Sequence, residues 1–313
     1  MTEFVTQFDI ALPSQKVLAV AFSPDGTRIA AGDRDGVIHI IDPENGAVLR
    51  KLKQHVEFVY ALAFDPDSGH LVSGGKDKSL REWDIESGTF LRDYTGIFQG
   101  GAAARTMAAQ SCRQTSNGHT MTVLSIACAG RGLMATSGQD RRVKLWKNGN
   151  AVRTYDWHSE PVPCVRFQPG TDILFSASKD RTVRSWNEET GAVIHKYTGH
   201  DTGIVGLEFV DENTFLSVDA SGQVYAWLVD DENPARALYL APRRLSCARK
   251  MPGRDVLVVG SEDGALEAVD IQKGTELAGI RLHTSQVRCI DVDARGRIAS
   301  CDNSGHVCLS TIR

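Results

Sequence analysis

The strongest constraint on this chain is an internal repeat. The segment SGGKDKSLREWDIESG around Trp83 returns as TSGQDRRVKLWKNG around Trp146 and as SASKDRTVRSWNEETG around Trp186. Four weaker copies fit the same frame, with their tryptophan sites at Ile41, Trp227, Val269 and Ser310. Successive sites are 42, 63, 40, 41, 42 and 41 residues apart, so a single insertion interrupts an otherwise regular period. A repeat of this length indicates a solenoid, a propeller or a similar array.

Each copy contains four short runs of β-branched, aromatic or alternating apolar residues, separated by turn residues. In the first copy these runs are VLAVAF at 17–22, TRIAAG, VIHII at 37–41 and AVLRKL. Such runs predict strands, and four strands in about 40 residues are typical of one propeller blade. The seven copies therefore predict an all-β fold, a seven-bladed β-propeller of four-stranded antiparallel blades.

The last copy is one strand short, because the sequence ends just after its third run at 306–312. The leading segment 3–10 is the natural fourth strand of that blade, and its pairing would close the ring and remove two open sheet edges. We expect one domain over 1–313, with residues 96–118 inserted as a loop between blades 2 and 3. The first run of each copy also carries a small residue where the blades would converge: Ala19, Ala61, Ser125, Cys164, Gly206, Ser246 and Cys289.

These features resemble the WD-repeat β-propellers over essentially the whole chain. The copies show a Gly-His-like start, as in Gly118-His119, and one literal Trp-Asp end at Trp83-Asp84. Five histidines precede a tryptophan site by 27 or 28 residues: His55, His119, His158, His200 and His283.

The resemblance implies a hydrogen-bonded set of His, Asp, Ser or Thr, and Trp inside each blade. Three copies have all four members: His55, Ser73, Asp77 and Trp83; His119, Thr136, Asp140 and Trp146; His158, Ser176, Asp180 and Trp186. Copy five keeps the His, Ser and Trp but has Ser221 at the Asp position. A catalytic Ser-His-Asp triad needs one such constellation at a cleft, so its repetition favours a structural role.

Composition narrows the possible functions. The formal charge is -4, from 35 basic and 39 acidic residues, which argues against holding nucleic acid by bulk electrostatics. No apolar run is long enough for a membrane helix, and neither metal-ligand spacing nor a phosphate loop occurs. We therefore expect no cofactor, no metal and no membrane insertion. Seven scattered cysteines without a CxxC pair indicate free thiols in a reducing compartment.

Candidate binding residues lie in the turns between the second and third strands, which the resemblance places on one face with the loops that join the blades. The turns of blades 5–7 and 1 are acidic, whereas those of blades 2–4 form a basic arc. The basic arc consists of Lys76, Lys78, Arg141, Arg142, Lys179 and Arg181. These charges are either an ordinary solvated surface or a site that receives an acidic peptide.

Two further segments depart from the repeat. The insertion contains Ile97, Phe98, Arg105 and Arg113 but no acidic residue, and a loop of its length is usually functional or disordered. In copy six, Arg249 takes the site held by phenylalanine in other copies, within a basic stretch that contains no acid. This stretch is either a frayed blade with snorkelling side chains or a site for an anion or phosphopeptide.

The sequence therefore predicts a non-catalytic scaffold, a monomeric propeller that binds one or more protein or peptide partners, acidic ones included, within a larger complex. One alternative is a nucleic-acid or chromatin reader that uses the basic arc. The other is an enzyme built on a propeller scaffold. The expected location is the cytoplasm, with the nucleus as the other reducing compartment.

Overall fold

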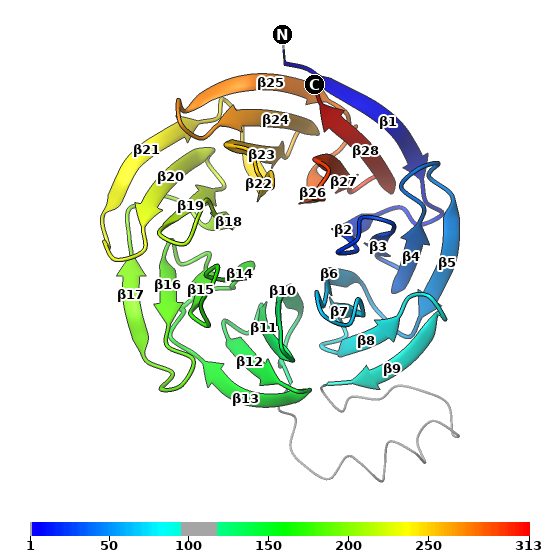
Figure 1. Ribbon diagram of the computed structural model, residues 1–313, viewed down its shortest axis with the longest axis horizontal. Coiled ribbons are helices and arrows are strands. Elements are labelled where there is room, and N and C mark those ends of the chain that lie inside the picture. Colours follow the sequence, from blue (N-terminus) through cyan, green and yellow to red (C-terminus); the bar gives the residue numbers. More distant parts are fainter. Residues whose placement is uncertain (1, 95–117) are drawn as a thin grey trace.

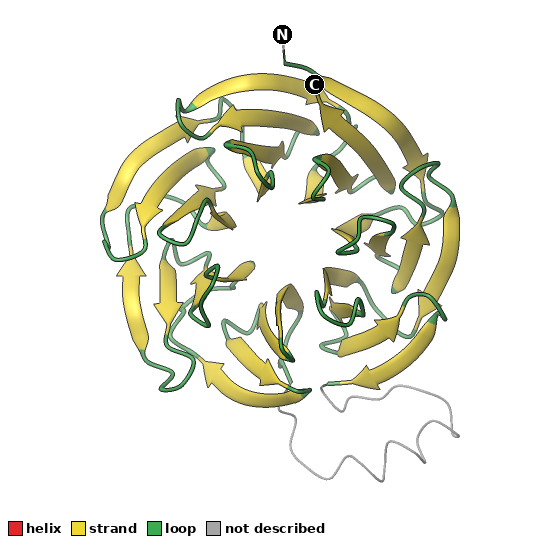
Figure 2. Cartoon of the chain, viewed as in Figure 1, coloured by secondary structure: helices red, strands yellow, loops and turns green. Residues whose placement is uncertain are grey.

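The computed structural model describes residues 2–94 and 118–313. In this part of the chain there are 28 strands and no helix, so none could cross a membrane (Figure 2). The strands form seven four-stranded sheets, arranged as blades around a central axis (Figure 1). Neighbouring strands in the blades are antiparallel. The predicted seven-bladed propeller is confirmed.

In the first four blades, the strands follow one another from the centre outward. Blade 1 contains β2 (Val17–Phe22), β3 (Ile29–Asp33), β4 (Val37–Ile41) and β5 (Val48–Lys53). Blade 2 contains β6 (Val59–Phe64), β7 (Leu71–Gly75), β8 (Leu80–Asp84) and β9 (Thr89–Asp93). Blade 3 contains β10 (Val123–Gly130), β11 (Leu133–Gly138), β12 (Val143–Lys147) and β13 (Asn150–Tyr155). Blade 4 contains β14 (Cys164–Phe167), β15 (Leu174–Ala177), β16 (Val183–Trp186) and β17 (Val193–Tyr197).

The remaining blades repeat this order until the chain returns to its beginning. Blade 5 contains β18 (Ile204–Phe209), β19 (Thr214–Asp219), β20 (Gln223–Leu228) and β21 (Pro234–Leu240). Blade 6 contains β22 (Leu245–Lys250), β23 (Val256–Ser261), β24 (Ala265–Asp270) and β25 (Thr275–Arg281). Blade 7 contains β26 (Val287–Val292), β27 (Arg297–Asp302), β28 (His306–Ile312) and, as its outermost strand, β1 (Phe4–Ala11).

The ring is closed by the first strand, as predicted. Strand β1 pairs antiparallel with β28, from Phe4 opposite Ile312 to Ala11 opposite His306, and both termini lie at this blade in Figure 1. The observed strand begins and ends one residue later than the predicted segment 3–10. Seven residues of β1 have pairing partners, so blade 7 has no missing strand.

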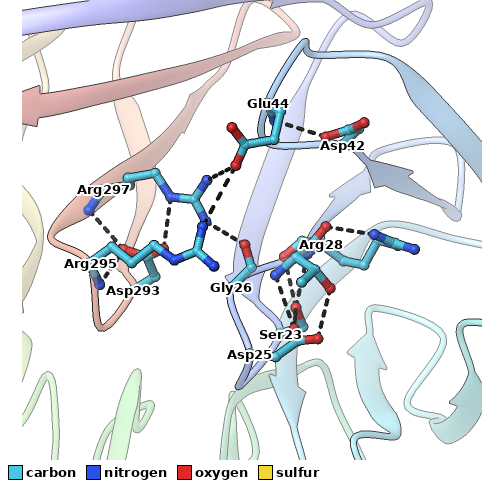
Figure 3. Close-up of polar contacts among 10 residues, drawn as sticks. Ser23, Asp25, Gly26, Arg28, Asp42, Glu44, Asp293, Arg295 and Arg297 are labelled. Carbon is cyan, nitrogen blue, oxygen red and sulfur yellow. Dashed lines mark hydrogen bonds and ion pairs between the residues drawn. The ribbon is translucent and has the colours of Figure 1, made fainter.

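A polar network joins blade 7 to blade 1 near this closure (Figure 3). Arg297 in β27 donates from Nε to Asp293 Oδ2 and from Nη1 to Glu44 Oε1, both at 2.8 Å, and its Nη2 donates to the carbonyl of Gly26. Its side chain is 7% exposed. Gly26 has a φ of +69°, and a Cβ added there would lie 2.9 Å from Asp293, so glycine permits this close approach.

The hydrophobic cores lie between neighbouring blades. One cluster joins Val17 and Ile29 of blade 1 to Ala299 and Leu309 of blade 7. Trp83, Trp146, Trp186 and Trp227 are among the largest fully buried side chains. Since each core needs two blades, the blades stabilise one another around the ring.

The inner strands share a register shift near their start, and this common register corrects one predicted position in blade 6. The shift recurs in six of the seven blades, for example between Leu245 and Cys247 in β22. Cys247, which pairs with Gly260, therefore occupies the place that Ala19, paired with Gly32, has in blade 1. The small residue expected at Ser246 is Cys247, which lies 22 residues before Val269, as Ala19 lies 22 residues before Ile41.

Candidate protein interface

Blade 2 contains the expected four-residue set in a closed hydrogen-bonded chain. The imidazole of His55 lies 2.9 Å from Asp77 through Nδ1 and 2.8 Å from Ser73 Oγ through Nε2. The indole Nε1 of Trp83 donates to the same Oγ at 2.8 Å. Burial lowers the pKa of His55, although Asp77 opposes this effect. A neutral imidazole fits the geometry, with Nδ1–H donating to Asp77 and Nε2 accepting from Ser73.

Blades 3 and 4 repeat this arrangement. In blade 3, His119 lies 2.9 Å from Asp140 and 2.9 Å from Thr136 Oγ1, which accepts from the indole of Trp146 at 2.8 Å. In blade 4, the three corresponding distances among His158, Asp180, Ser176 and Trp186 are all 2.8 Å. The hydroxyl-bearing residue of each blade is fully buried and accepts an indole proton. A hydroxyl held in this way cannot reach a substrate, so the three sets are structural.

Blade 5 corrects the sequence analysis, which found serine at the Asp position. Asp219, two residues before Ser221, supplies the carboxylate and lies 2.9 Å from His200 Nδ1. Ser221 Oγ donates to Asp219 at 2.6 Å. In blade 7, Asp302 lies at the corresponding position, 3.2 Å from His283. The signal was present in the sequence, because both turns have aspartate where blades 2 and 3 have glycine.

Blades 1 and 6, which lack the loop histidine, use other polar pairs. In blade 1, His39 of β4 lies 2.9 Å from Asp33 through Nε2, and both side chains are buried. In blade 6, Arg243 pairs with Glu267 at 2.7 Å and with Asp263 at 3.1 Å. Sequence reasoning missed both pairs, since His39, Arg243 and Glu267 lie at positions that are not members of the repeated four-residue set.

The turns between second and third strands and the loops that enter the blades lie on one face, called the turn face here. Backbone bonds join each turn to the loop of its own blade. Lys76 N donates to Phe58 O at 2.8 Å, and Lys179 N donates to Pro161 O at 2.9 Å. The turns and the loops of this face therefore form one continuous surface.

The basic arc lies on this face, and its cations project from turns whose carboxylates are already engaged. Asp77, Asp140 and Asp180 each accept from a histidine and are buried inside their blades, so none of them forms an ion pair with a cation of the arc. Burial alone would raise the pKa of Asp77, but the interaction with His55, the hydrogen bond from Ser79 and the charge of Arg81 together outweigh it and hold that pKa below its usual range.

Most cations of the arc have no acidic partner. Lys76 lies 3.7 Å from Glu57, an exposed pair. Among the described residues the other five have no ion pair, and the sequence has no acid at 95–117. The face therefore carries unneutralised positive charge over blades 2–4.

Backbone conformation distinguishes the same three blades. Lys78, Arg141 and Arg181 have φ values of 66°, 65° and 70°, in the left-handed region. The equivalent residues of the other blades are Gly36, Gly222, Gly264 and Gly305, which adopt this region without steric cost. In blades 2–4 a basic side chain is thus placed where glycine would be less strained.

Three exposed apolar side chains accompany the basic arc. Val56, Met121 and Trp157 are 52%, 48% and 64% exposed, and they lie in the loops that enter blades 2, 3 and 4. Phe58 lies beneath the ammonium of Lys76, 5.0 Å from its ring centroid. Sequence reasoning missed these residues, although each exposed one lies within two positions of a repeat histidine. A surface on which exposed apolar side chains alternate with cations is more typical of a protein-binding site than of an ordinary solvated surface.

The expected acidic half of the turn face is much weaker than the sequence indicated. Asp33, Asp219 and Asp302 are buried in their pairs with histidine. Glu262 pairs with Arg244 at 3.0 Å, and Asp263 pairs with Arg243. The contrast between blades therefore arises mainly from the exposed cations of blades 2–4.

Arg249 does not occupy the site predicted for it. In the observed register Lys250, paired with Leu257, takes the place of Phe22, and Arg249 lies one position earlier. Arg249 pairs with Glu208 at 3.0 Å and with Asp291 at 2.8 Å, so its charge is already satisfied by two carboxylates from neighbouring blades. The stretch itself contains no acid, as the sequence shows, but Glu208 and Asp291 reach Arg249 from segments distant in sequence.

Some predicted features lie outside the described residues. Ile97, Phe98, Arg105 and Arg113 belong to this group, as does nearly all of the 96–118 insertion. In the described part of the chain, no three His, Cys, Asp or Glu side chains gather as a metal site would require. Six cysteines there are free thiols.

Comparison with known proteins is consistent with this architecture. The family model for the WD domain, G-beta repeat, matches residues 8–42, 46–84, 110–147 and 149–187. Similar curated proteins include pre-mRNA-processing factor 19 of Bos taurus, 24% identical over 50% of this chain and 32% of its own length. Eukaryotic translation initiation factor 3 subunit I of Nematostella vectensis is 25% identical over 56% of this chain and 58% of its own. WD repeat-containing protein 90 of Homo sapiens is 28% identical over 60% of this chain and 12% of its own.

The fold and the repeated hydrogen-bonded sets define a WD-type β-propeller. The chain belongs to the WD-repeat family. The alignments cover between about an eighth and three fifths of these three relatives, and about half or more of this chain. Propellers of this family generally act as non-catalytic scaffolds for protein interaction.

Proposed function

We propose that this protein is a non-catalytic scaffold whose turn face binds an acidic segment of a protein partner across blades 2–4. The observation that carries the proposal is the placement of Lys78, Arg141 and Arg181 in left-handed conformation at positions where the other blades have glycine. Three equivalent turns accept backbone strain and present a cation, which suggests that the side chain itself is needed.

The neighbouring residues specify the chemistry of the partner. Unpaired cations attract and orient a negatively charged segment, and this contributes mainly to association rate and specificity. Val56, Met121 and Trp157 supply apolar contact area next to those charges. A partially buried tryptophan is a common energetic anchor at interfaces. The favoured partner is therefore an acidic segment that also carries apolar side chains.

Assembly and location follow from the same proposal. We propose that 1–313 act as one monomeric propeller within a larger complex, in the cytoplasm or the nucleus. One relative is, by its printed name, a subunit of a translation initiation factor, which suits a role inside an assembly. The free thiols suit a reducing compartment.

The direct test is affinity capture with charge-reversed variants. The double variant Arg141→Glu with Arg142→Glu should lose its principal partner, and Trp157→Ser should weaken capture. Lys51→Glu with Lys53→Glu, on the outer strand β5, changes net charge equally and is the matched control. Capture that survives reversal of the arc, or is lost equally in the control, would refute the proposed face.

A second arm tests the alternative of nucleic-acid binding. Labelled duplex DNA and single-stranded RNA are titrated at low and moderate salt. Affinity that falls steeply with salt and disappears in the Arg141→Glu, Arg142→Glu variant would favour a nucleic-acid reader instead.

The insertion is tested separately. We propose that 96–118 form a loop between blades 2 and 3 and that Ile97, Phe98, Arg105 and Arg113 contribute to the same contact. Replacing 97–117 with a short Gly-Ser link should weaken partner capture while leaving the thermal midpoint unchanged. Full retention of the partner would restrict the interface to the turns and loops of the basic arc and its neighbours.

A further inference from the structure

The inner strands of all seven blades line a central channel. Its cavity has a volume of about 790 Å³, within the range of small-molecule sites. Strands β2, β6, β10, β14, β18, β22 and β26 face this space (Figure 1). The channel opens at the turn face, where Lys179, Arg244 and Gln286 line it.

The two sides of the channel differ in chemistry. The lining from blades 1–3 contains no charged residue and includes Leu18, Tyr60 and Leu124 near the turn face. The lining from blades 4–7 contains five cations: Arg166, Lys179, Arg244, Arg249 and Arg288. One side is therefore apolar and the other cationic, in a protein whose formal net charge is -4.

Two of the five cations belong to a charge-balanced belt at the end of the channel away from the turn face. Glu208 accepts from Arg166 at 2.7 Å and from Arg249 at 3.0 Å. Asp291 accepts from Arg249 Nε at 2.9 Å and from the backbone N of Phe22 at 2.7 Å. These carboxylates neutralise Arg166 and Arg249, so the belt offers no free charge to a ligand.

Three cations remain at the end nearer the turn face, with one carboxylate between them. Glu262 pairs with Arg244 at 3.0 Å. Arg288 and Lys179 have no acidic partner among the described residues, and 95–117 contain no acidic residue that could supply one. The excess positive charge of the channel is therefore located at these two side chains.

Arg288 is the less satisfied of the two. Its Nε is buried and has no hydrogen-bond partner, and its Nη1 reaches Gln286 Oε1 only at 3.5 Å. Because the buried Nε is closed to the channel, an anion there would accept from the Nη groups, through charge-assisted hydrogen bonds to a guanidinium that has no carboxylate partner. Desolvation lowers the pKa of Lys179, and the charges of Arg288 and Arg244 lower it further, which a nearby anion would offset.

We propose that this end of the channel binds a small organic carboxylate with an aromatic or aliphatic body. The carboxylate accepts from the planar fork of Arg288 and from the ammonium of Lys179, and the body packs on Leu18, Tyr60 and Leu124. A concave cavity that combines apolar side chains with a few charged or polar groups is the usual form of a small-molecule site. The site shares Lys179 with the basic arc, whereas Arg288 belongs to the channel alone and is not part of the proposed protein interface.

The test uses dansyl-phenylalanine, a fluorescent carboxylate with an aromatic body, titrated into the full chain. Wild type should show saturable, one-site binding with a blue shift of emission. Dansyl-phenylalaninamide, which lacks the carboxylate, should bind at least tenfold more weakly. Arg288→Gln should weaken binding of the acid at least tenfold, and Arg288→Lys should restore part of the loss. Thermal midpoints establish that each variant is folded.

Arg181→Gln is the matched control, because Arg181 belongs to the basic arc but does not line the channel. It should bind the acid as wild type does. The proposal is overturned if wild type shows no saturable binding, if acid and amide bind equally, or if Arg288→Gln binds as wild type does. Partner capture by Arg288→Gln should be normal, so failure of this site and failure of the proposed function can be distinguished.

Discussion

Asp219 offers a sharp test of how the blades are held together. In the buried set of blade 5, its Oδ2 accepts from His200, and its Oδ1 accepts from the backbone N of Ser221, Ser221 Oγ and the backbone N of Gln223. Asp219→Asn keeps the shape but can preserve only one acceptor oxygen. If that oxygen serves the turn, the new amide N–H faces the Nδ1–H of His200, and two buried donors meet.

The expected loss follows from the titration of this carboxyl. Burial alone would raise the pKa of Asp219, but the hydrogen bonds from His200 and Ser221 lower it from 3.8 to about 2. A downward shift of this size corresponds to roughly 2 kcal/mol of folding free energy. Because the folded pKa is below the unfolded one, this stabilisation is present above about pH 4 and is lost as the pH falls toward 2.

Urea and thermal unfolding at pH 7 measure the effect. Asp219→Asn should lower the unfolding free energy by about 2 kcal/mol, and the difference from wild type should shrink as the pH approaches 2. Asp231→Asn, at an exposed position in the same blade, is the control and should change little. If Asp219→Asn is as stable as this control at pH 7, Asp219 does not serve as the missing member of the blade 5 set.

Three other predictions concern the ring and its thiols. Arg297→Gln should lower the free energy of unfolding by about 3 kcal/mol, because it leaves the buried Asp293 without its partner, whereas the exposed Arg295→Gln should lower it far less. Equal urea midpoints for the two variants would refute this account of the contact between blades 7 and 1. Deleting residues 2–11 should lower the thermal midpoint and cause self-association in gel filtration, because β28 becomes an open edge; a monomer of unchanged midpoint would show that closure by β1 is dispensable. In a Cys112→Ser variant the remaining thiols should react slowly with a disulfide reagent at pH 8. Burial raises the pKa of Cys164 to about 11 and raises the pKa of each of the other five thiols as well. Rapid labelling of the folded protein would contradict this.

The repeat made the fold predictable. A period near 40 residues with four strand-like runs specifies a blade, and the short last copy indicated where β1 had to pair. These inferences depend on the local pattern of apolar runs and turn residues, which recurs in each copy of the repeat. The four-residue sets of blades 2–4 were equally accessible, because all their members occur at fixed spacing.

Other features depend on contacts that no single copy specifies. In blade 5 the carboxylate comes from Asp219, two residues before the expected position at Ser221. The histidine Nδ1–H can donate to a carboxylate at either position. Arg249 was placed one residue wrong because the weak sixth copy was aligned one residue out of register, and its acidic partners come from blades 5 and 7. The unpaired state of Arg288 is likewise visible only once the channel lining from all blades is known.

The most direct test of the proposed scaffold function is hydrogen–deuterium exchange on the complex with the captured partner. The account predicts protection in the turns at 75–79, 138–142 and 178–182, in the loops at 56–58, 120–122 and 157–161, and in the insertion at 96–118. The turns on the opposite face, at 65–69 and 294–296, should exchange as they do in the free protein. Protection of that opposite face, with the turns of the basic arc unchanged, would contradict the central claim.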